Sequence, residues 1–393
     1  MKGTPLGRAL NKAACHWATS TAASSDWVQL LASTQVAAAG MPPIGQGEPP
    51  LSFFEFWPAW LFYAPVWIWI VLLMLWHRSI RLPLLANPTL PAGGLVGEEK
   101  SRLFARLGST GSGCLPAWIL VSPSDEPADV VRSLEDAGLA FPLVAKPDIG
   151  CRGAGVRPIR NGDDLVRYRS EFPDSCNFIL QRMVDVEGEA GVFFVRAPGE
   201  RRGTIVSLTL KYFPHVVGNG TATLRELILG DPRAGRVPHL YLDRFAEELD
   251  LVLPAGEARR LVFSGSHSKG AIFRNGNAWI TQAMCARFNA IADEIGEFHF
   301  GRFDVRFADF EAFRRGEDFS IIEYNGAGAE ATHIWDARTR LIDAWHTLCV
   351  QFLILFRLGA ANARRGYRPM SFREFFRQWK REKSLVRRYP STQ

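Results

Sequence analysis

The feature that most constrains this chain is an uncharged segment of twenty residues at positions 57–76. As a helix rising about 1.5 Å per residue, it would be about 30 Å long, the hydrocarbon thickness of a bilayer. It holds five tryptophans and one tyrosine, some near its ends, where interfacial aromatic side chains are common. The pattern predicts a single membrane helix. A buried core helix, or a hairpin lying in the membrane interface, is the alternative.

The residues around this segment predict its orientation. Pro65 lies inside it and is expected to kink or divide the helix. His77, Arg78 and Arg81 follow directly, and the positive-inside rule places such residues in the cytoplasm. The sequence therefore predicts an inner (cytoplasmic) membrane protein with membrane lipid as a partner. Its large C-terminal part is expected to face the cytoplasm.

The remainder of the chain divides by composition. Residues 1–50 are rich in small residues and proline and are predicted to be a disordered extension, followed by the membrane segment at 51–81. Residues 82–98 are rich in proline and glycine and are predicted to be a linker. From residue 99 short apolar segments alternate with helical patterns to about residue 335, which indicates an α/β or α+β fold. Residues 336–393 are predicted to be C-terminal helices with a basic tail.

Charge and cysteine usage exclude some functions. Residues 364–388 contain ten Lys/Arg and two Glu, although the whole chain has a net charge of only +6. Residues 371–388 place aromatic side chains on one face of a helix and basic ones on the other, which suits either an anionic membrane or docking onto the folded domain. The aromatic residues are not interleaved along a sheet, so no nucleic-acid partner is expected. The six cysteines form no CxxC pair and no zinc pattern.

A lysine and a glycine-rich loop form the first candidate site. An apolar strand at 141–146 ends at Lys146, and Gly150, Gly153 and Gly155 follow. Glycines let backbone N–H groups approach phosphate oxygens, and the lysine adds a positive charge. The order of residues differs from a Walker A motif. A surface lysine before a glycine-rich hairpin is the alternative.

A second segment, at 178–195, reads as two strands joined by a polar turn. The backbone of residues 181–184 could bond to the edge of an adenine. A carboxylate a few residues later, Glu187 or Glu189, could hold ribose hydroxyls. A plain hairpin explains this segment equally well.

The third segment carries the strongest signal. Asp304 lies in the apolar strand 301–307, and Glu323 and Asn325 lie in the strand 319–325. Glu323 and Asn325 are two positions apart, so both side chains point to the same face of the strand. Carboxylate and amide oxygens suit Mg²⁺, which usually completes its coordination with phosphate oxygens and water. A structural salt bridge to a neighbouring arginine is the alternative.

Taken in order, these segments resemble the ATP-grasp superfamily, and GRFDV followed by IIEYNG is similar to D-alanine–D-alanine ligase and related carboxylate–amine ligases. The resemblance covers roughly residues 99–335. It implies an α+β fold in which two subdomains clasp ATP. Residues 141–335 would be the ATP-grasp domain, and residues 99–140 the remnant of the domain that usually precedes it.

The resemblance also implies roles for single residues. It implies ATP and Mg²⁺ as cofactors, with Mn²⁺ as an alternative metal. The metal ligands would be Asp304, Glu323 and Asn325. Arg302 would stabilise charge at the reacting acyl carbon, and Lys211 would be a second phosphate lysine. The nucleotide would contact Lys146, Gly153, Gly155, Gln181, Arg182, Val184 and Glu189, with Glu187 as the alternative to Glu189.

The implied reaction is ATP-dependent formation of a C–N bond through an acyl phosphate. Such chemistry needs positioning and charge neutralisation more than a protein nucleophile. The sequence thus predicts a membrane-tethered carboxylate–amine ligase acting on small-molecule or lipid-linked substrates. A phosphotransferase and a catalytically inactive ATP-binding membrane scaffold are the alternatives. The sequence predicts no oligomeric state.

Overall fold

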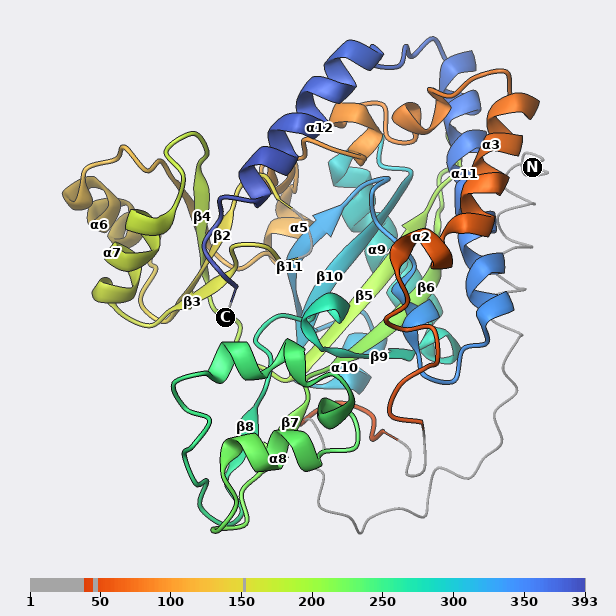
Figure 1. Ribbon diagram of the computed structural model, residues 1–393. Helices are drawn as coiled ribbons and strands as arrows, with labels where there is room; N and C mark the ends of the chain where they lie inside the picture. The colour runs from red at the N-terminus through yellow and green to blue at the C-terminus, as the bar shows by residue number, and fades with distance from the viewer. Residues whose placement is uncertain (1–38, 45–48, 151–152, 393) are drawn as a thin grey trace.

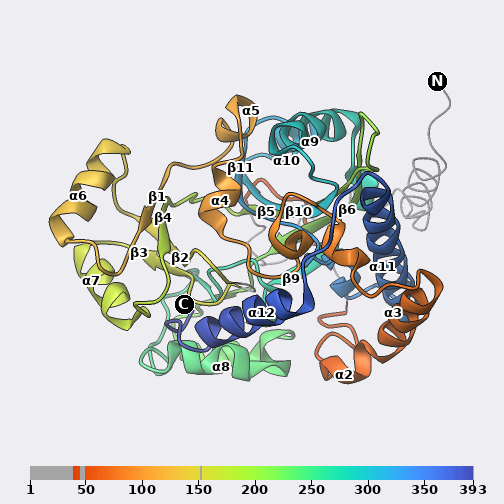
Figure 2. The same cartoon turned by 90° about the horizontal axis from the view of Figure 1, so that it is seen from above.

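A computed structural model describes residues 39–44, 49–150 and 153–392. Two antiparallel sheets dominate the fold, one of five strands and one of four, and a two-stranded ribbon lies beside them. Helices pack on both faces of the five-stranded sheet, as the two views together show (Figures 1 and 2). The chain is therefore an α+β protein, as the sequence predicted.

The five-stranded sheet has the order β11-β10-β5-β6-β9, and every neighbouring pair is antiparallel. β-Branched and aromatic residues are frequent in these strands and favour them. Their bounds are β5 Gly188–Val195, β6 Thr204–Tyr212, β9 Ile272–Asn275, β10 Phe300–Phe307 and β11 Phe319–Asn325.

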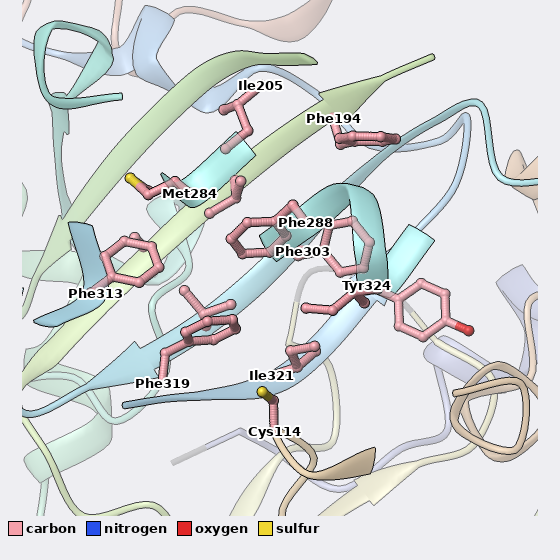
Figure 3. Packing of buried hydrophobic residues seen from close by; sticks show 14 of the residues in the cluster. Cys114, Phe194, Ile205, Met284, Phe288, Phe303, Phe313, Phe319, Ile321 and Tyr324 are labelled. Atoms are coloured by element: carbon pink, nitrogen blue, oxygen red, sulfur yellow. The ribbon is translucent and has the colours of Figure 1, made fainter. Parts of the chain in front are cut away.

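One face of this sheet builds the main hydrophobic core. Helix α9 (Gln282–Ile295) packs on it through Met284, Phe288 and Ile291, none of which is exposed to solvent. The Phe288 ring lies 5.3 Å from the ring of Phe303 on β10, and Figure 3 shows the two near the centre of the cluster. Helix α10 (Phe310–Arg314) closes the same core.

The opposite face is apolar at one end and charged at the other. At the apolar end, helix α11 (Leu341–Arg364) packs through Ile354, Leu355 and Leu358 against Phe193 and Phe300 of the sheet. By length and composition, α11 is the one helix in the described ranges that could cross a membrane, and 44% of its most apolar window is buried. Its contacts are those of a core helix.

The four-stranded sheet has the order β1-β4-β2-β3 and is also antiparallel. β1, from the region predicted to be the remnant of a preceding domain, is one of its two edge strands. Its helices pack through Leu134, Leu165 and Tyr168. The bounds are β1 Trp118–Val121, β2 Leu143–Pro147, β3 Arg157–Ile159, β4 Phe178–Arg182, α6 Pro127–Asp136 and α7 Gly162–Glu171.

A smaller unit inserts between β6 and β9. The strands β7 (His215–Val217) and β8 (Ala258–Arg260) pair in antiparallel fashion. Helix α8 (Leu224–Gly230) begins with a capping box made by Thr223 and Glu226, which satisfies backbone N–H groups at its start. Short 3-10 helices complete the unit: η3 Ala234–Arg236, η4 Pro238–Leu240, η5 Leu242–Phe245 and η6 His267–Lys269. Another 3-10 helix, η7 (Asn277–Trp279), follows β9.

The uncharged segment is not one twenty-residue helix, and this part of the prediction was wrong. It forms α2 (Ala59–Phe62) and α3 (Ala64–Trp76), which are separated at Tyr63. Pro65 falls in the first turn of α3, and it causes the division. A proline is tolerated in a first turn, where the backbone N–H groups have no helical partner, but it disrupts a helix that began earlier in the chain. The thirteen residues of α3 span only about 20 Å. One side of α3 packs on α11, through Val66 and Leu73.

Residues 82–98, predicted from their composition to be a linker, are packed segments of the fold. They form η1 (Leu82–Leu85) and η2 (Pro91–Gly94), and most of their apolar side chains are buried. Asn87 is fully buried, and its side chain bonds to the backbone of Gly93, His299 and Phe300. Proline and glycine here serve close backbone packing. The short helices α4 (Lys100–Phe104) and α5 (Ser109–Ser112) follow.

The predicted N-terminal extension lies mostly outside the described residues. Its described part is packed: Met41 joins the main core, and the backbone carbonyl of Gly40 accepts a hydrogen bond from the amide of Phe310. At the other end of the chain, helix α12 (Phe372–Val386) starts at an Ser371 cap and crosses the molecule on the side opposite α9 (Figure 2).

Candidate active site

The candidate site lies on the charged end of the five-stranded sheet. Strand periodicity places Arg302, Asp304 and Arg306 on one face of β10, and Phe303 and Val305 on the core face. The register then brings residues that are far apart in sequence together. Glu189 of β5 lies opposite Lys211 of β6 on one side and Arg306 on the other.

These side chains form a continuous chain of buried ion pairs. Arg306 Nε lies 3.1 Å from Glu189 Oε2, and Lys211 Nζ lies 3.0 Å from Glu189 Oε1. Lys211 Nζ also lies 2.9 Å from Asp304 Oδ1, and Arg302 grips both oxygens of Asp304, at 2.9 and 3.0 Å. Three cations thus surround two carboxylates. The group as a whole has a net positive charge, which would attract an anion.

The pKa values follow from this arrangement. Burial opposes ionisation of Asp304, but the charges of Arg302 and Lys211 outweigh it and lower its pKa to about 2. Burial likewise opposes ionisation of Glu189, and Lys211 and Arg306 bring its pKa below the ordinary value. Both carboxylates are therefore charged throughout the physiological range.

The three predicted metal ligands meet on one face. Asp304 lies directly opposite Glu323 in the β10–β11 pairing, and Asn325 is two residues further along. Asp304 accepts three hydrogen bonds and keeps one free position on Oδ2. Glu323 meets only Lys100, at 3.4 Å, and the Asn325 amide makes no hydrogen bond within the described ranges.

This donor set fits a metal ion that a substrate helps to hold. No group of three or more His, Cys, Asp and Glu side chains in the described part of the chain is placed to hold an ion alone. Two carboxylates and one amide oxygen, however, are the partial set that Mg²⁺ uses when phosphate oxygens and water complete its shell. Asp304, Glu323 and Asn325 would hold it.

Lys146 lies where the two sheets meet. Its Nζ donates to Gln181 Oε1 and to the carbonyl oxygen of Ile322, both at 2.7 Å, and lies 4.8 Å from the centre of the Phe104 ring. Burial lowers the pKa of Lys146 to about 7, with Glu323 opposing that change. A phosphate beside it would restore its charge.

A second lysine, Lys100, was missed from the sequence. Its Nζ contacts Glu323 and donates to the carbonyl oxygen of Gly150, at 2.9 Å, so it joins β11, which carries two of the predicted metal ligands, to the glycine-rich loop. Beside it, Glu98 accepts a hydrogen bond from the amide of Gly326, at 3.0 Å. Burial, and to a lesser extent Glu323 and Glu382, raise the pKa of Glu98 to about 8. The run GGLVGEEK contains both residues, but its glycines favour a linker and hide this signal.

The described part of the glycine-rich loop is fixed from two sides. Gly153 and Gly155 have φ values of +69° and +70°, which favour glycine. Thr392 Oγ1 donates to the carbonyl oxygen of Gly153 at 2.7 Å, and Tyr389 Oη donates to the carbonyl oxygen of Ile149. Residues 387–392, here called the C-terminal strap, therefore hold both ends of the loop.

The structure separates the residues predicted to contact adenine and ribose. The Gln181 amide donates to the carbonyl oxygen of Pro116, at 3.3 Å, and Val184 offers its carbonyl oxygen to Arg306. Arg182 is exposed and donates to the carbonyl oxygen of Gly138, so it does not point toward this group.

The two candidate ribose carboxylates also differ. Glu189 is committed to Lys211 and Arg306, and Gly265 packs closely over it. Glu187 lies 3.3 Å from Arg260 through Oε1, while its buried Oε2 has no hydrogen-bond partner in the described structure. Geometry therefore makes Glu187 the carboxylate with a free acceptor, although the sequence favoured Glu189.

Beyond Arg302, the N-terminal segment borders the site. Arg302 donates to the carbonyl oxygen of Glu330 at 3.1 Å, and the Glu330 side chain accepts hydrogen bonds from Trp335 and Tyr63. Glu55 pairs with His267 Nε2 at 3.1 Å. The segment predicted as a membrane anchor thus packs on the loops beside the charged group.

Solved structures with a similar arrangement include ATP-grasp ligases. They include D-alanine–D-alanine ligase from Bacillus anthracis (10% identity, TM-score 0.39, covering 73% of this chain and 71% of that one). The ATP-grasp ligase PsnB, complexed with a minimal precursor, matches at 11% identity and a TM-score of 0.33, covering 65% and 60%. A bifunctional glutathione synthetase from Pasteurella multocida matches at 13% and 0.32, covering 66% and 38%.

The chain thus spans less than two thirds of the length of the glutathione synthetase and of PsnB. No family model and no curated protein matches the sequence. The expected similarity to ATP-grasp ligases is confirmed as a structural similarity, at low identity and low TM-score. A function for this chain must therefore be argued from its own residues.

Proposed function

We propose that this protein is an ATP-dependent carboxylate–amine ligase. The observation that carries the proposal is the placement of Asp304 opposite Glu323, with Asn325 beside them and Lys146, Lys211 and Arg302 around them. Oxygen ligands for a metal and cations for phosphate oxygens are the two requirements of phosphoryl transfer from ATP.

The reaction would proceed in two steps. An oxygen of the substrate carboxylate attacks the γ-phosphorus of ATP, ADP leaves, and an acyl phosphate forms. The nitrogen of an amine then attacks the acyl carbon, phosphate leaves, and the nitrogen loses a proton as the C–N bond forms. Mg²⁺, when bound, would neutralise the phosphate charge that develops in the first step.

The residues of this chain would act mainly by position and charge. Lys146 and Lys211 would hold phosphate oxygens, and Arg302 would face the charge that develops at the acyl carbon, since it already binds the Asp304 carboxylate. Arg302 also donates a hydrogen bond to the carbonyl oxygen of Glu330. It would therefore connect the reacting centre to the loop that contains Glu330, on the side where the amine would bind.

One observation favours the alternative of an inactive nucleotide-binding scaffold. Asp304 and Glu189 are already satisfied by neighbouring cations, so metal and nucleotide would have to compete with these ion pairs. A phosphotransferase would use the same site but release a phosphorylated product instead of free phosphate.

We also propose that the ligase works at the cytoplasmic face of the inner membrane, on small-molecule or lipid-linked substrates. The exposed apolar residues of α3, among them Trp67 and Leu75, support a membrane partner. A lipid-linked substrate would explain why an enzyme of this kind is held there.

Turnover by the full-length protein tests the ligase proposal. ADP and phosphate release would be measured with Mg²⁺-ATP and a panel of carboxylates and amines. We expect release that requires both substrates, and Glu323→Gln should reduce it by about a thousandfold or more without lowering the melting temperature. Exposed Glu317 offers the control Glu317→Gln. ATP binding without turnover on every pair would instead support the scaffold.

A further inference from the structure

The outer face of α3 is apolar and exposed to solvent. Its inner face packs on α11, and Trp69 Nε1 donates to the carbonyl oxygen of Cys349 at 2.9 Å. Its outer face carries six large apolar side chains that are each 51–70% exposed. They are Trp67, Ile68, Val71, Leu72, Leu75 and Trp76.

These six residues form a single stripe, because their spacing follows the turns of the helix. A helix without charges that leaves so much apolar surface in water indicates a partner that covers it. The inner face is already occupied by α11, so lipid cannot surround α3. Its length of about 20 Å is also too short to cross a bilayer.

A positively charged hollow lies at the C-terminal end of the same helix. It has a volume of about 510 Å³ and is lined by Met74, Leu75, Arg78, Ser79, Ile80 and Arg81. Arg78 and Arg81 are exposed, and neither has an ion-pair partner within the described ranges. Guanidinium groups beside apolar walls suit the phosphate of a lipid whose acyl chain lies along the helix.

Helix α12 continues this surface. The guanidinium carbon of Arg81 lies 5.9 Å from the centre of the Phe372 ring, so α12 begins next to the hollow. Phe372 and Phe376 are 40% and 51% exposed. Exposed Arg373 and Lys380 add positive charge on the same helix.

We propose that the outer stripe of α3, the hollow and the first turns of α12 form a docking face that lies flat on an anionic bilayer. Tryptophan and arginine at the edges of an apolar stripe match the interface between headgroups and acyl chains. The proposal deepens the membrane location proposed above. It replaces a spanning helix with an interfacial one and names anionic phospholipid as the ligand.

Vesicle co-sedimentation of the full-length protein tests the docking face. Phosphatidylcholine vesicles with and without phosphatidylglycerol would be compared at low and high salt. We expect tight binding only with phosphatidylglycerol, and weaker binding as salt rises. Arg78→Gln with Arg81→Gln should weaken binding about thirtyfold, since each charge contributes about 1 kcal/mol.

The apolar stripe has its own variant and a matched control. Ile68→Asp with Leu72→Asp should weaken vesicle binding about a hundredfold. Val131→Asp with Val166→Asp changes two equally exposed apolar residues, 52% and 68% exposed, on α6 and α7, and should bind as the wild type does. Melting temperatures would show that each variant folds.

The proposal would be overturned by wild-type binding by both the aspartate and the glutamine variants, by equal binding to neutral vesicles, or by resistance to alkaline extraction, which indicates a spanning helix. Loss of a dimer in the aspartate variant, with vesicle binding unchanged, would assign the stripe to a second copy instead. Turnover would be assayed on the same preparations. Vesicle binding without turnover would reject the ligase alone, and turnover without vesicle binding would reject the docking face alone.

Discussion

The two faces of the five-stranded sheet use the same strands for opposite purposes. On β10, Phe303 and Val305 enter a closed aromatic core, while Arg302 and Asp304, their immediate neighbours, enter a buried ionic group. The apolar face is stabilised by the burial of apolar surface and by close packing. Neither depends on small changes of charge elsewhere in the protein. The ionic face is stabilised only while every charge keeps its partner. The comparison suggests that one face determines stability and the other determines activity.

The largest effect should come from the apolar face. Phe303 is fully buried and lies 5.3–5.6 Å from three other aromatic rings. Phe303→Ala should cost about 3–5 kcal/mol of stability through lost burial and a residual cavity. Thermal unfolding would report the loss, and turnover per folded molecule, measured well below the melting temperature, should stay near wild type. A fall in turnover as large as that of an ionic-face variant would contradict this division of roles between the two faces.

On the ionic face, Lys211→Met should cost about 3 kcal/mol, because two buried carboxylates lose the cation between them while Arg302 and Arg306 remain. Turnover should fall at least about a hundredfold, since the charge proposed to hold phosphate is also lost. A double-mutant cycle with Asp304→Asn measures the coupling between the two residues. Independent effects would show that the pair does not act as a unit.

The stability of the protein should depend on pH through Glu98, at the edge of the ionic face. Burial raises the pKa of Glu98 to about 8, so the folded protein holds this proton more tightly than the unfolded chain. Its contribution to stability is full below about pH 4.5 and is lost as pH rises toward 8. Between pH 5 and 8, the stability of the wild type should therefore fall by about 2 kcal/mol relative to that of Glu98→Gln. The side chain is partly exposed, which makes this loss smaller than the full pKa change would give.

Paired melting curves of the two proteins across this range would check that sign. Lys146 is common to both proteins, so its own titration cancels in the comparison. A difference that is constant with pH would mean that Glu98 is ionised in the folded protein, as an ordinary surface glutamate is.

The smallest effect should come from the C-terminal strap. Tyr389→Phe removes a hydrogen bond to the carbonyl oxygen of Ile149, which is worth about 1 kcal/mol. We expect the KM for ATP to rise about threefold to fivefold with kcat nearly unchanged, because the strap positions the glycine-rich loop without touching the reacting atoms. Tyr367→Phe, in the connection between α11 and α12, is the matched control. A change in kcat alone would contradict this role.

The spacing of residues along the sequence predicted those features that depend only on neighbouring residues. The two-residue spacing of Glu323 and Asn325 was enough to place them on one face. The alternation of apolar segments left α/β and α+β open, and the resemblance to the ATP-grasp superfamily favoured α+β. The ion pairs of Asp304 with Lys211 could not be predicted, because they depend on the register of strands about ninety residues apart.

Composition gave a wrong prediction where glycine and proline allow close packing of the backbone instead of forming a linker. Gly94 approaches the backbone of Gly326 so closely that a side chain would clash, and this contact places Lys100 beside Glu323. Nothing in the local sequence distinguishes such a buried segment from a linker. The uncharged run at 57–76 was misread for a related reason: apolar content does not show that α11, almost three hundred residues later, covers one side of it.

The C-terminal strap has a consequence for how the protein is made. Residues 387–392 reach back to Ile149 and Gly153, more than two hundred residues earlier in the chain. A ribosome has therefore already released both sheets, which can fold, before the last support of the glycine-rich loop emerges. The nascent chain carries an incompletely supported glycine-rich loop until then. Products of translation truncated before residue 387 should keep the core of the five-stranded sheet, while the loop proposed to hold nucleotide lacks its hydrogen bonds to the strap.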